Sequence, residues 1–270
     1  MSFLTLDNVS HYYFSKTDYT KALENVSFSI KKGEFISILG PSGCGKTTIL
    51  SIIAGILKQT EGKVLLKQKP IGQAKLAIGY MLQQDYLFPW KTIIDNVLLG
   101  PSIGKINHQD IKEKGLSLLE EVGLSDVVNA YPESLSGGMR QRAALVRTLI
   151  TNPEVLLLDE PFSALDYLTK LKLEDLVFEL LKTYQKTAVL VTHDIGEAIS
   201  MSDRLIIMDS NPGTITKLID VPIELRNERP FLVRRHPKYQ MIFDQVWSEL
   251  NKYETVTNEE GGVTNEEKSR

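Results

Sequence analysis

The segment that most constrains this chain is Gly40-Pro41-Ser42-Gly43-Cys44-Gly45-Lys46-Thr47, which fits the pattern G-x-x-x-x-G-K-[ST]. It directly follows the apolar run 35–39, which is typical of a strand buried on both faces, and it precedes the helix-compatible stretch 47–57. The alternative is a plain glycine-rich turn. The strand before the segment and the helix after it favour a phosphate-binding loop in an α/β protein.

The chemistry of this loop follows from its residue types. Its glycines let backbone N–H groups converge on phosphate oxygens, and the helix N-terminus that follows favours negative charge. Lys46 can reach the β- and γ-phosphates of a nucleotide, and the Thr47 hydroxyl can ligate Mg²⁺. Because a thiolate would repel phosphate, we expect Cys44 to be a neutral small side chain rather than a redox sensor.

Further strand and helix signals place the loop in a larger sheet. Strand patterns recur at 26–30, 63–66, 76–82, 155–158, 188–191 and 205–208, with a helical stretch over 168–183. Buried strands that alternate with helices predict a mostly parallel sheet covered on both faces. Helical periodicity dominates residues 91–150, which predicts an inserted helical subdomain.

Two carboxylates follow the apolar run 155–158, at the end of a strand where ligands bind open α/β sheets. Asp159 is suited to hold Mg²⁺ directly or through water, and Glu160 to polarise an attacking water as general base. Many buried strands end in an acidic turn, so this pattern is weak alone. Its pairing with the phosphate loop makes it a strong indication of nucleotide hydrolysis.

The next segments indicate which family of nucleotide-binding proteins this chain resembles. Leu135-Ser136-Gly137-Gly138-Met139-Arg140-Gln141-Arg142 opens a helical run and resembles the signature motif of ABC-type ATPases. Three further segments resemble motifs of the same family: the D-loop Ser163-Ala164-Leu165-Asp166, the switch histidine in Thr192-His193-Asp194, and the Q-loop Gln83. The order and spacing of these motifs match the family from about residue 2 to 220.

This resemblance implies a P-loop NTPase (RecA-like) α/β fold with an N-terminal antiparallel β subdomain. It implies an ATPase domain over 1–225, a C-terminal helical extension over 226–253, and a head-to-tail dimer with ATP between Lys46 of one subunit and Ser136 of the other. Catalytic roles are implied for Glu160, His193 and Gln83, and Mg²⁺ contacts for Thr47, Gln83 and Asp159. The implied nucleotide-binding residues are Tyr13, Gly40, Pro41, Ser42, Gly43, Cys44, Gly45, Lys46, Thr47, Thr48, Ser136, Gly137, Gly138 and Asp166.

Some of these assignments have rivals in the sequence. Gln84 competes with Gln83, which we prefer for its spacing to Pro89-Trp90. Tyr13 fits the position of the aromatic residue that stacks on adenine, with Tyr12 as the rival.

Other side chains are open to a structural explanation. His193 has the alternative of a satisfied histidine at a strand end, although its Thr-His-Asp context favours a γ-phosphate contact. Asp166 is better suited to organise the dimer interface than to transfer a proton. Arg142 and Arg147 lie on the signature helix, where a solvated basic face and a phosphate contact are both open.

Composition limits the partners, the compartment and the membrane role that the chain can have. The chain has 270 residues, 42% hydrophobic and 24% charged, with a formal net charge of −3, which gives no electrostatic reason to expect a nucleic-acid partner. A single cysteine excludes an internal disulfide and favours a reducing compartment. No apolar run approaches the roughly 20 residues that cross a bilayer, so we expect a soluble chain whose membrane role comes through partners.

Resemblance to this family does not by itself determine the function of the chain. About 110 residues without sustained heptads separate Lys46 from Asp159, so the long coiled coil of repair and chromosome members is missing. A single ATPase domain resembles importers whose channel is a separate polypeptide, which implies a peripheral place at the cytoplasmic face of the membrane, permease subunits and an external solute-binding protein as partners. The alternative is a non-transport ABC ATPase that acts on nucleic acid or ribosomes.

Two segments bear on partners and cargo. Leu87-Phe88-Pro89-Trp90 is a candidate docking point for the channel, with a small local core around Trp90 as the alternative. Arg229-Pro230 and an amphipathic helix over 239–250 resemble the tail of importers for nitrate, sulfonate, taurine and related solutes, including pyrimidine-type vitamin precursors. The polar residues 254–270 predict disorder.

Overall fold

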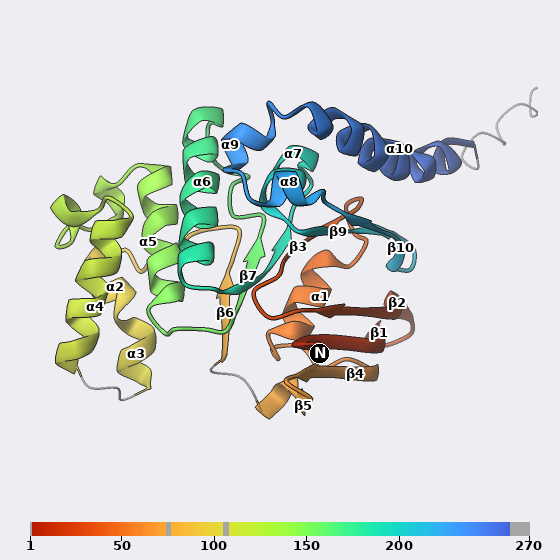
Figure 1. The fold of residues 1–270 in the computed structure, drawn as a ribbon. Helices are drawn as coiled ribbons and strands as arrows, with labels where there is room; N and C mark the ends of the chain where they lie inside the picture. Colours follow the sequence, from red (N-terminus) through yellow and green to blue (C-terminus); the bar gives the residue numbers. More distant parts are fainter. Residues whose placement is uncertain (1, 74–76, 105–107, 260–270) are drawn as a thin grey trace, which may run out of the picture.

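The computed structural model describes residues 2–73, 77–104 and 108–259, which form two sheets with helices around them (Figure 1). The larger sheet has six strands in the order β10-β9-β3-β8-β7-β6. All neighbours pair in parallel except β9 and β10, which are antiparallel. Its strands are β3 (Phe35–Leu39), β6 (Ile78–Met81), β7 (Val155–Asp159), β8 (Thr187–Val191), β9 (Arg204–Asp209) and β10 (Thr214–Asp220).

The strands β3, β7 and β8 are buried on both faces, as their unbroken apolar runs predict. Along β7, Leu156 and Leu158 enter one core cluster while Val155 and Leu157 enter another. The first cluster lies under helices α5 (Gly137–Leu149) and α6 (Tyr167–Thr183), and the second lies under α1 (Lys46–Ile53). The carboxyl ends of β3, β7 and β8 are therefore held at one rigid edge of the sheet.

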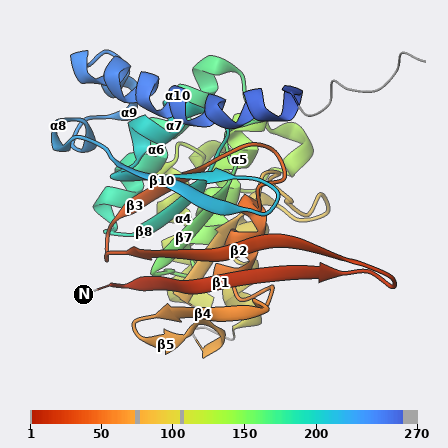
Figure 2. The ribbon, with the colours of Figure 1, turned by 90° about the vertical axis from the view of Figure 1, so that its right-hand side faces the viewer.

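The smaller sheet is antiparallel and covers α1 from the other side, as Figure 2 shows. Its order is β2-β1-β4-β5, with bounds β1 (Leu4–Phe14), β2 (Tyr19–Ile30), β4 (Glu61–Leu66) and β5 (Lys69–Pro70). The strand expected over 26–30 is the end of the longer β2, which pairs with β1 along its whole length. The N-terminal antiparallel sheet of the expected fold class is thus present.

Between β6 and β7 the chain first forms a loop and then a group of helices, on the side of the large sheet away from the small one (Figure 1). The helices are α2 (Ile93–Val97), α3 (Leu99–Ile103), α4 (His108–Glu121) and α5, with short 3₁₀ turns at Ser125–Val127 and Pro132–Ser134. Buried residues of α2, α4 and α5 share one cluster with the sheet. The helical insertion therefore packs on the sheet's core rather than around a core of its own.

The chain ends in helices α7 (Ile195–Met201), α8 (Ile223–Arg226), α9 (Pro230–Val233) and α10 (Pro237–Glu259). The tail helix expected over 239–250 is α10, which extends to Glu259 and so into the stretch 254–270 for which the sequence predicts disorder. Polar residues there include no Gly or Pro before Gly261, so nothing breaks the helix. Residues 260–270 lie outside the described residues. Helix α1 ends at Ile53, short of the expected 57, because Gly55 adopts φ +68° and closes it.

Candidate functional site

The phosphate loop joins the end of β3 to the start of α1. Gly43 and Gly45 have φ of +81° and +90°, a backbone conformation that residues with a Cβ rarely adopt. A Cβ at Gly45 would lie 2.5 Å from Leu23 Cδ2, and one at Gly40 would lie 2.6 Å from the Met208 carbonyl oxygen. Glycine is therefore favoured at Gly43 by conformation, required at Gly40 by space, and required at Gly45 by both.

Lys46 is folded over this loop. Its Nζ donates hydrogen bonds to the carbonyl oxygens of Gly40 at 2.7 Å and Pro41 at 2.9 Å. Cys44 is fully buried, and burial raises the pKa of its thiol above the usual range, against the influence of Lys46. The thiol is therefore neutral at physiological pH, which agrees with the expectation for this position.

A cleft of about 550 Å³ opens above the loop. Among the residues expected at the site, those that line it are Tyr13, Gly40, Ser42, Gly43, Gly45, Lys46, Thr47, Thr48, Glu160 and His193. Four residues that the sequence did not point to also line it, namely Thr20, Lys21, Ala22 and Asn211. The cleft thus gathers the small sheet, the phosphate loop and the ends of two central strands around one space.

Asp159 lies behind the loop in a cluster of oxygen atoms. The Thr47 hydroxyl donates to its Oδ1 at 3.4 Å, and the Tyr80 hydroxyl donates to its Oδ2 at 3.0 Å. Burial raises the pKa of Asp159, and the bonds from Tyr80 and Thr47 oppose this rise. Carboxylate and hydroxyl oxygens are the donors that Mg²⁺ prefers, so Thr47 and Asp159 fit this ion. Tyr80 is a site residue that sequence reasoning missed.

Glu160 and His193 face each other at the ends of neighbouring strands. Glu160 adopts φ +46°, and its N–H donates to the Val191 carbonyl at 2.9 Å, which fixes this unusual backbone conformation. His193 Nδ1 lies 3.3 Å from Glu160 Oε2. Both side chains reach the cleft, with exposed fractions of 66% for His193 and 24% for Glu160.

The structure favours Gln83 over Gln84 as the glutamine of the site. Both glutamines are exposed, but Gln83 Nε2 donates to Glu160 Oε2 at 3.4 Å and to Ser163 Oγ at 3.3 Å. Among the described residues, the hydrogen bonds of the Gln83 side chain go to Glu160 and Ser163 and not to the expected metal ligands Thr47 and Asp159. Gln83 is thus brought beside the general-base candidate.

Tyr13 and Tyr12 lie on opposite faces of β1. Tyr13 lines the cleft, and its hydroxyl lies 3.2 Å from Thr48 Oγ1. The ring of Tyr12 instead contacts Phe14 and Tyr19, with centroids 6.3 and 5.8 Å away. Alternation along the strand therefore places only Tyr13 where an adenine base could stack.

The signature segment lies outside the cleft. Ser136 is exposed and caps helix α5, where its Oγ accepts the Met139 N–H at 3.4 Å. A Cβ at Gly138 would lie 2.4 Å from Thr169 Cγ2, so the segment packs against the start of α6. Asp166 caps α6 by accepting the Thr169 N–H at 3.1 Å. The structure thus brings Ser136, Gly137, Gly138 and Asp166 together, but away from Lys46.

The loop after Gln83 is braced from helix α5. Arg147 donates to the carbonyl oxygens of Asp85 at 2.5 Å and Tyr86 at 2.7 Å, and Arg142 donates to the Val122 carbonyl at 2.8 Å. Both arginines therefore hold loop carbonyl groups in place. This role differs from both alternatives raised by the sequence, a solvated basic face and a phosphate contact. Trp90 is 70% exposed, so it does not form a local core.

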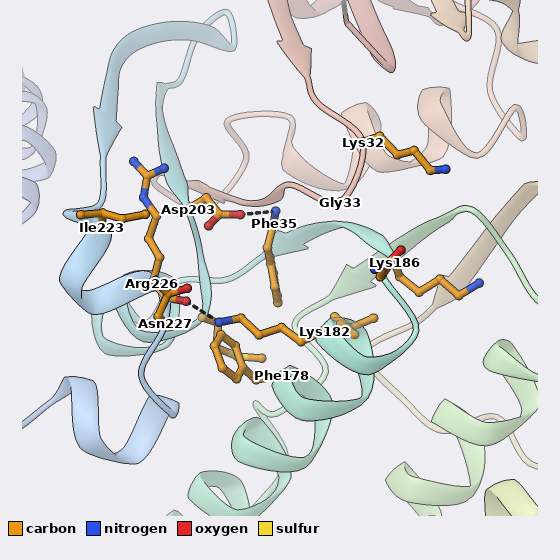
Figure 3. Close-up of a pocket in the computed structure, with 13 residues that line it drawn as sticks. Lys32, Gly33, Phe35, Phe178, Lys182, Lys186, Asp203, Ile223, Arg226 and Asn227 are labelled. Atoms are coloured by element: carbon orange, nitrogen blue, oxygen red, sulfur yellow. Dashed lines mark hydrogen bonds between the residues drawn. The ribbon is translucent and has the colours of Figure 1, made fainter.

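A second cavity, of about 420 Å³, lies at the amino end of β3, whereas the phosphate loop follows the carboxyl end of that strand (Figure 3). Three of its charged side chains are already engaged in hydrogen bonds. Lys182 Nζ donates to the Arg226 carbonyl at 2.7 Å, Lys186 Nζ to Asn152 Oδ1 at 2.7 Å, and Asp203 accepts the Phe35 N–H at 2.8 Å. We assign no ligand to this cavity.

Comparison with known proteins places these features in a family. The sequence profile described as "ABC transporter" matches residues 23–163. An uncharacterised ABC transporter ATP-binding protein of Bacillus subtilis, YtlC, is 57% identical over 254 residues, which cover 94% of this chain and 98% of the relative. The aliphatic sulfonates import ATP-binding protein SsuB of Bacillus cereus is 39% identical over 217 residues, covering 80% of this chain and 85% of the relative.

Solved structures give the same result for the fold. The dimeric ATP-binding cassette MJ0796, in a post-hydrolysis state with ADP and Pi, aligns with a TM-score of 0.72 and 34% identity over 81% of this chain and 99% of that chain. The CbiO1 protein of Clostridium perfringens, part of the ABC transporter complex CbiONQ, aligns with a TM-score of 0.74 and 26% identity over 90% and 98%. The chain belongs to the ATP-binding, ATP-hydrolysing proteins of the ABC transporter family.

Proposed function

We propose that this protein is the ATP-hydrolysing subunit of an importer that drives uptake of a small solute through separate permease subunits. The observation that carries the proposal is the cleft that holds Lys46, Glu160, His193 and Tyr13 together in a chain of this family. Among the described residues, no helix has both the length and the apolar character needed to cross a bilayer. As the similarity to ATP-binding subunits of transporters suggests, the proposed transmembrane path belongs to partner chains, and the proposed place of this subunit is the cytoplasmic face of the membrane.

The proposed reaction is in-line attack of water on the γ-phosphate of ATP. Tyr13 stacks on adenine, the loop N–H groups and Lys46 hold the phosphates, and Glu160 accepts the proton of the attacking water. His193 contacts the γ-phosphate, and Gln83 orients Glu160 through its amide. Thr47 and Asp159 would hold Mg²⁺, which would supply neutralisation of the phosphate charge.

A second copy of the chain is proposed to complete the site. Ser136 is exposed at the N-terminus of the 13-residue helix α5 and lies outside its own chain's cleft. Backbone N–H groups at a helix N-terminus favour an anion such as the γ-phosphate. Head-to-tail pairing would bring Ser136 of one copy over Lys46 of the other and exclude water from the γ-phosphate. The dimeric cassette to which this chain is similar supports this arrangement.

The loop after Gln83 is the proposed contact with the permease. Trp90 and Tyr86 are 70% and 58% exposed, and the Trp90 ring lies 5.1 Å from that of Phe88. Exposed aromatic side chains on a braced loop are suited to fill a pocket of a partner. The same loop begins at Gln83, beside Glu160, so docking is linked to the hydrolytic groups.

The cargo class is proposed from the relatives. SsuB, named for the import of aliphatic sulfonates, is similar over 80% of this chain. This relative supports the sulfonates within the proposed class of nitrate, sulfonate, taurine and related small solutes, including pyrimidine-type vitamin precursors. An extracytoplasmic solute-binding protein is the proposed source of the cargo.

Uptake in source cells tests this function. Cells that lack the chain should lose uptake of a labelled alkanesulfonate, taurine, nitrate or pyrimidine precursor, and wild-type chain should restore it while Glu160→Gln should not. Glu154→Gln, at the opposite end of β7 and 37% exposed, is the matched control and should restore uptake. Glu160→Gln should also co-purify from membranes with a multi-spanning protein when ATP is present. Unchanged uptake, together with co-purified ribosomal proteins or nucleic acid, would overturn import.

A further inference from the structure

The C-terminal segment, residues 226–253, reaches the loop that carries His193 although it stands apart from the nucleotide cleft. All residues that line the cleft precede residue 212. Helices α9 and α10 lie over α6 and α7 in Figure 1, and Val233 and Val246 share a buried cluster with Ile195 at the start of α7. This end of the chain is therefore packed against the element that follows His193.

The residues on both sides of His193 are held in place. The Thr192 hydroxyl donates to the Glu197 carboxylate, and the Asp194 N–H donates to Thr192 Oγ1 at 3.0 Å. Asp194 Oδ1 accepts the Glu197 N–H at 3.1 Å and so caps α7. The exposed imidazole of His193 thus takes its direction from two flanking residues rather than from packing of its own ring.

Lys170 on α6 ties these groups together. Its Nζ lies 2.6 Å from Asp194 Oδ2 and 2.5 Å from Glu197 Oε1. Lys170 is 15% exposed, Glu197 3% and Asp194 36%, so water screens the ion pair with Glu197 weakly and the ion pair with Asp194 more strongly. The position of Asp194, and with it that of His193, therefore depends on where the Lys170 ammonium group lies.

A residue of the C-terminal segment balances the charge next to Lys170. Glu174 lies one helical turn after Lys170 and is completely buried, and its Oε2 lies 2.7 Å from Arg234. Burial raises the pKa of Glu174 to about 7, although Arg234 opposes the rise. Arg234 is thus the main cation that favours the ionised form of Glu174, and Lys170 contributes less.

The contact between the C-terminal segment and α7 is also tight. A Cβ at Gly196 would lie 3.0 Å from Asp194 Oδ1, 3.1 Å from Tyr239 Oη and 3.6 Å from Arg234 Nε. Gly196 is therefore enclosed by the carboxylate next to His193 and by two side chains of the C-terminal segment.

We propose that Arg234 is a positioning residue for hydrolysis: it neutralises Glu174, which leaves Lys170 on Asp194 and keeps His193 directed at Glu160. The inference rests on the proposed role of His193. Removal of Arg234 leaves Lys170, one turn away, as the cation that must neutralise Glu174 whenever this buried carboxyl is ionised. Lys170 is then shared among three carboxylates, and its hold on Asp194 weakens.

The first test is steady-state hydrolysis of ATP at pH 8.5 by the full-length chain carrying Arg234→Met, because alkaline pH favours the ionised form of Glu174, whose pKa is about 7 in the wild-type chain. We expect kcat to fall about tenfold with KM for ATP within about twofold of wild type, because a misplaced group costs rate rather than ground-state binding. Arg234→Lys should retain the wild-type rate. Arg229→Met is the matched control, because Arg229 also pairs with α6, at 2.7 Å from Glu179, but both partners are exposed. Equal kcat for Arg234→Met and Arg229→Met would overturn the proposal.

A double-variant cycle separates positioning through His193 from a general structural effect. In a His193→Ala background, Arg234→Met should cause no further loss of kcat. If the fold losses of kcat in the two single variants multiply instead, Arg234 does not act through His193. The inference then fails, while the proposed function is unaffected. If His193→Ala alone hydrolyses ATP at the wild-type rate, the proposed role of His193 fails first.

A further variant keeps the test decisive if Arg234→Met does not fold. Glu174→Gln/Arg234→Met removes both members of the buried ion pair and leaves no carboxylate to draw Lys170 away from Asp194. We expect this double variant to hydrolyse ATP within about twofold of wild type. A kcat as low as that of His193→Ala in the folded double variant would overturn the proposal.

Discussion

His193 and Glu160 approach within 3.3 Å between Nδ1 and Oε2, from the ends of the neighbouring strands β8 and β7. The left-handed backbone of Glu160, with φ +46°, turns its side chain toward this contact. A carboxylate held beside an imidazole at the rim of the nucleotide cleft is placed to accept a proton from water.

Glu160→Gln removes this proton acceptor but keeps the shape and the contact with Gln83. We expect ATP to bind with near wild-type affinity, hydrolysis to slow by at least about 100-fold, and a dimer to accumulate with ATP. Phosphate release, nucleotide binding and size-exclusion chromatography measure the three effects. Normal turnover in this variant would remove Glu160 as the general base.

Lys46→Ala removes the ammonium group at the phosphate loop. Charge-assisted hydrogen bonds contribute about 1.5–3 kcal/mol, so ATP affinity should fall by roughly 10- to 100-fold. Titration with a fluorescent ATP analogue checks this value. Lys63→Ala, on an exposed lysine of β4, should leave affinity unchanged. The assignment of the loop fails if Lys46→Ala binds ATP as wild type does.

Tyr13→Ala should weaken ATP binding by roughly tenfold, because base–aromatic stacking contributes about 1–3 kcal/mol. Tyr13→Phe should bind as wild type, since the ring rather than the hydroxyl is used. Tyr12→Ala is the natural control, because this ring contacts Phe14 and Tyr19 instead of the cleft. If Tyr12→Ala alone weakens binding, the stacking residue is Tyr12.

The local parts of this site could be predicted from the sequence, whereas the long-range parts could not. The phosphate loop and Asp159 follow short apolar runs that are buried on both faces, and such runs are visible without knowledge of the fold. β1 escaped residue-level prediction because its alternation breaks near Asn8, where φ is +49° and the pairing with β2 shifts register. Only the family resemblance indicated an antiparallel sheet there.

Tyr80 and Arg234 show a second limit. Tyr80 reaches Asp159 because β6 pairs in parallel with β7, a pairing across more than 70 residues that no local pattern encodes. Arg234 reaches Glu174 through the packing of α9 on α6, which are 60 residues apart in the chain. The sequence shows only that Tyr80 is an aromatic residue in a predicted strand and that Arg234 lies in a basic stretch. Neither pattern identifies the residue that the side chain contacts.

Tyr80→Phe tests the support of Asp159. The Tyr80 hydroxyl donates to Asp159 and opposes the rise in pKa that burial causes, so its loss should raise the pKa of Asp159 further. The acidic limb of the hydrolysis–pH profile should move to higher pH, and half-maximal activity should need more Mg²⁺. Tyr86→Phe, on the exposed loop, is the control. Identical pH and Mg²⁺ profiles would show that Tyr80 does not support Asp159.

The buried Glu174 carboxyl predicts a pH dependence of stability. Its folded-state pKa of about 7 lies above the ordinary 4.5, so the folded protein holds a proton that the unfolded chain has released. The unfolding free energy should therefore fall as pH rises toward 7 and level off above it. Between pH 6 and pH 8 this group accounts for about 1 kcal/mol.

Glu174→Gln should remove that contribution, because the amide does not titrate. Urea denaturation at pH 6 and pH 8 measures it as the difference between the wild-type and variant changes in unfolding free energy. Glu179→Gln, on the same helix but 47% exposed, should behave as wild type. A wild-type pH dependence in Glu174→Gln would mean that Arg234 holds Glu174 ionised throughout this range. The pair would then be a permanent ion pair, and its charge balance with Lys170 would not change with pH.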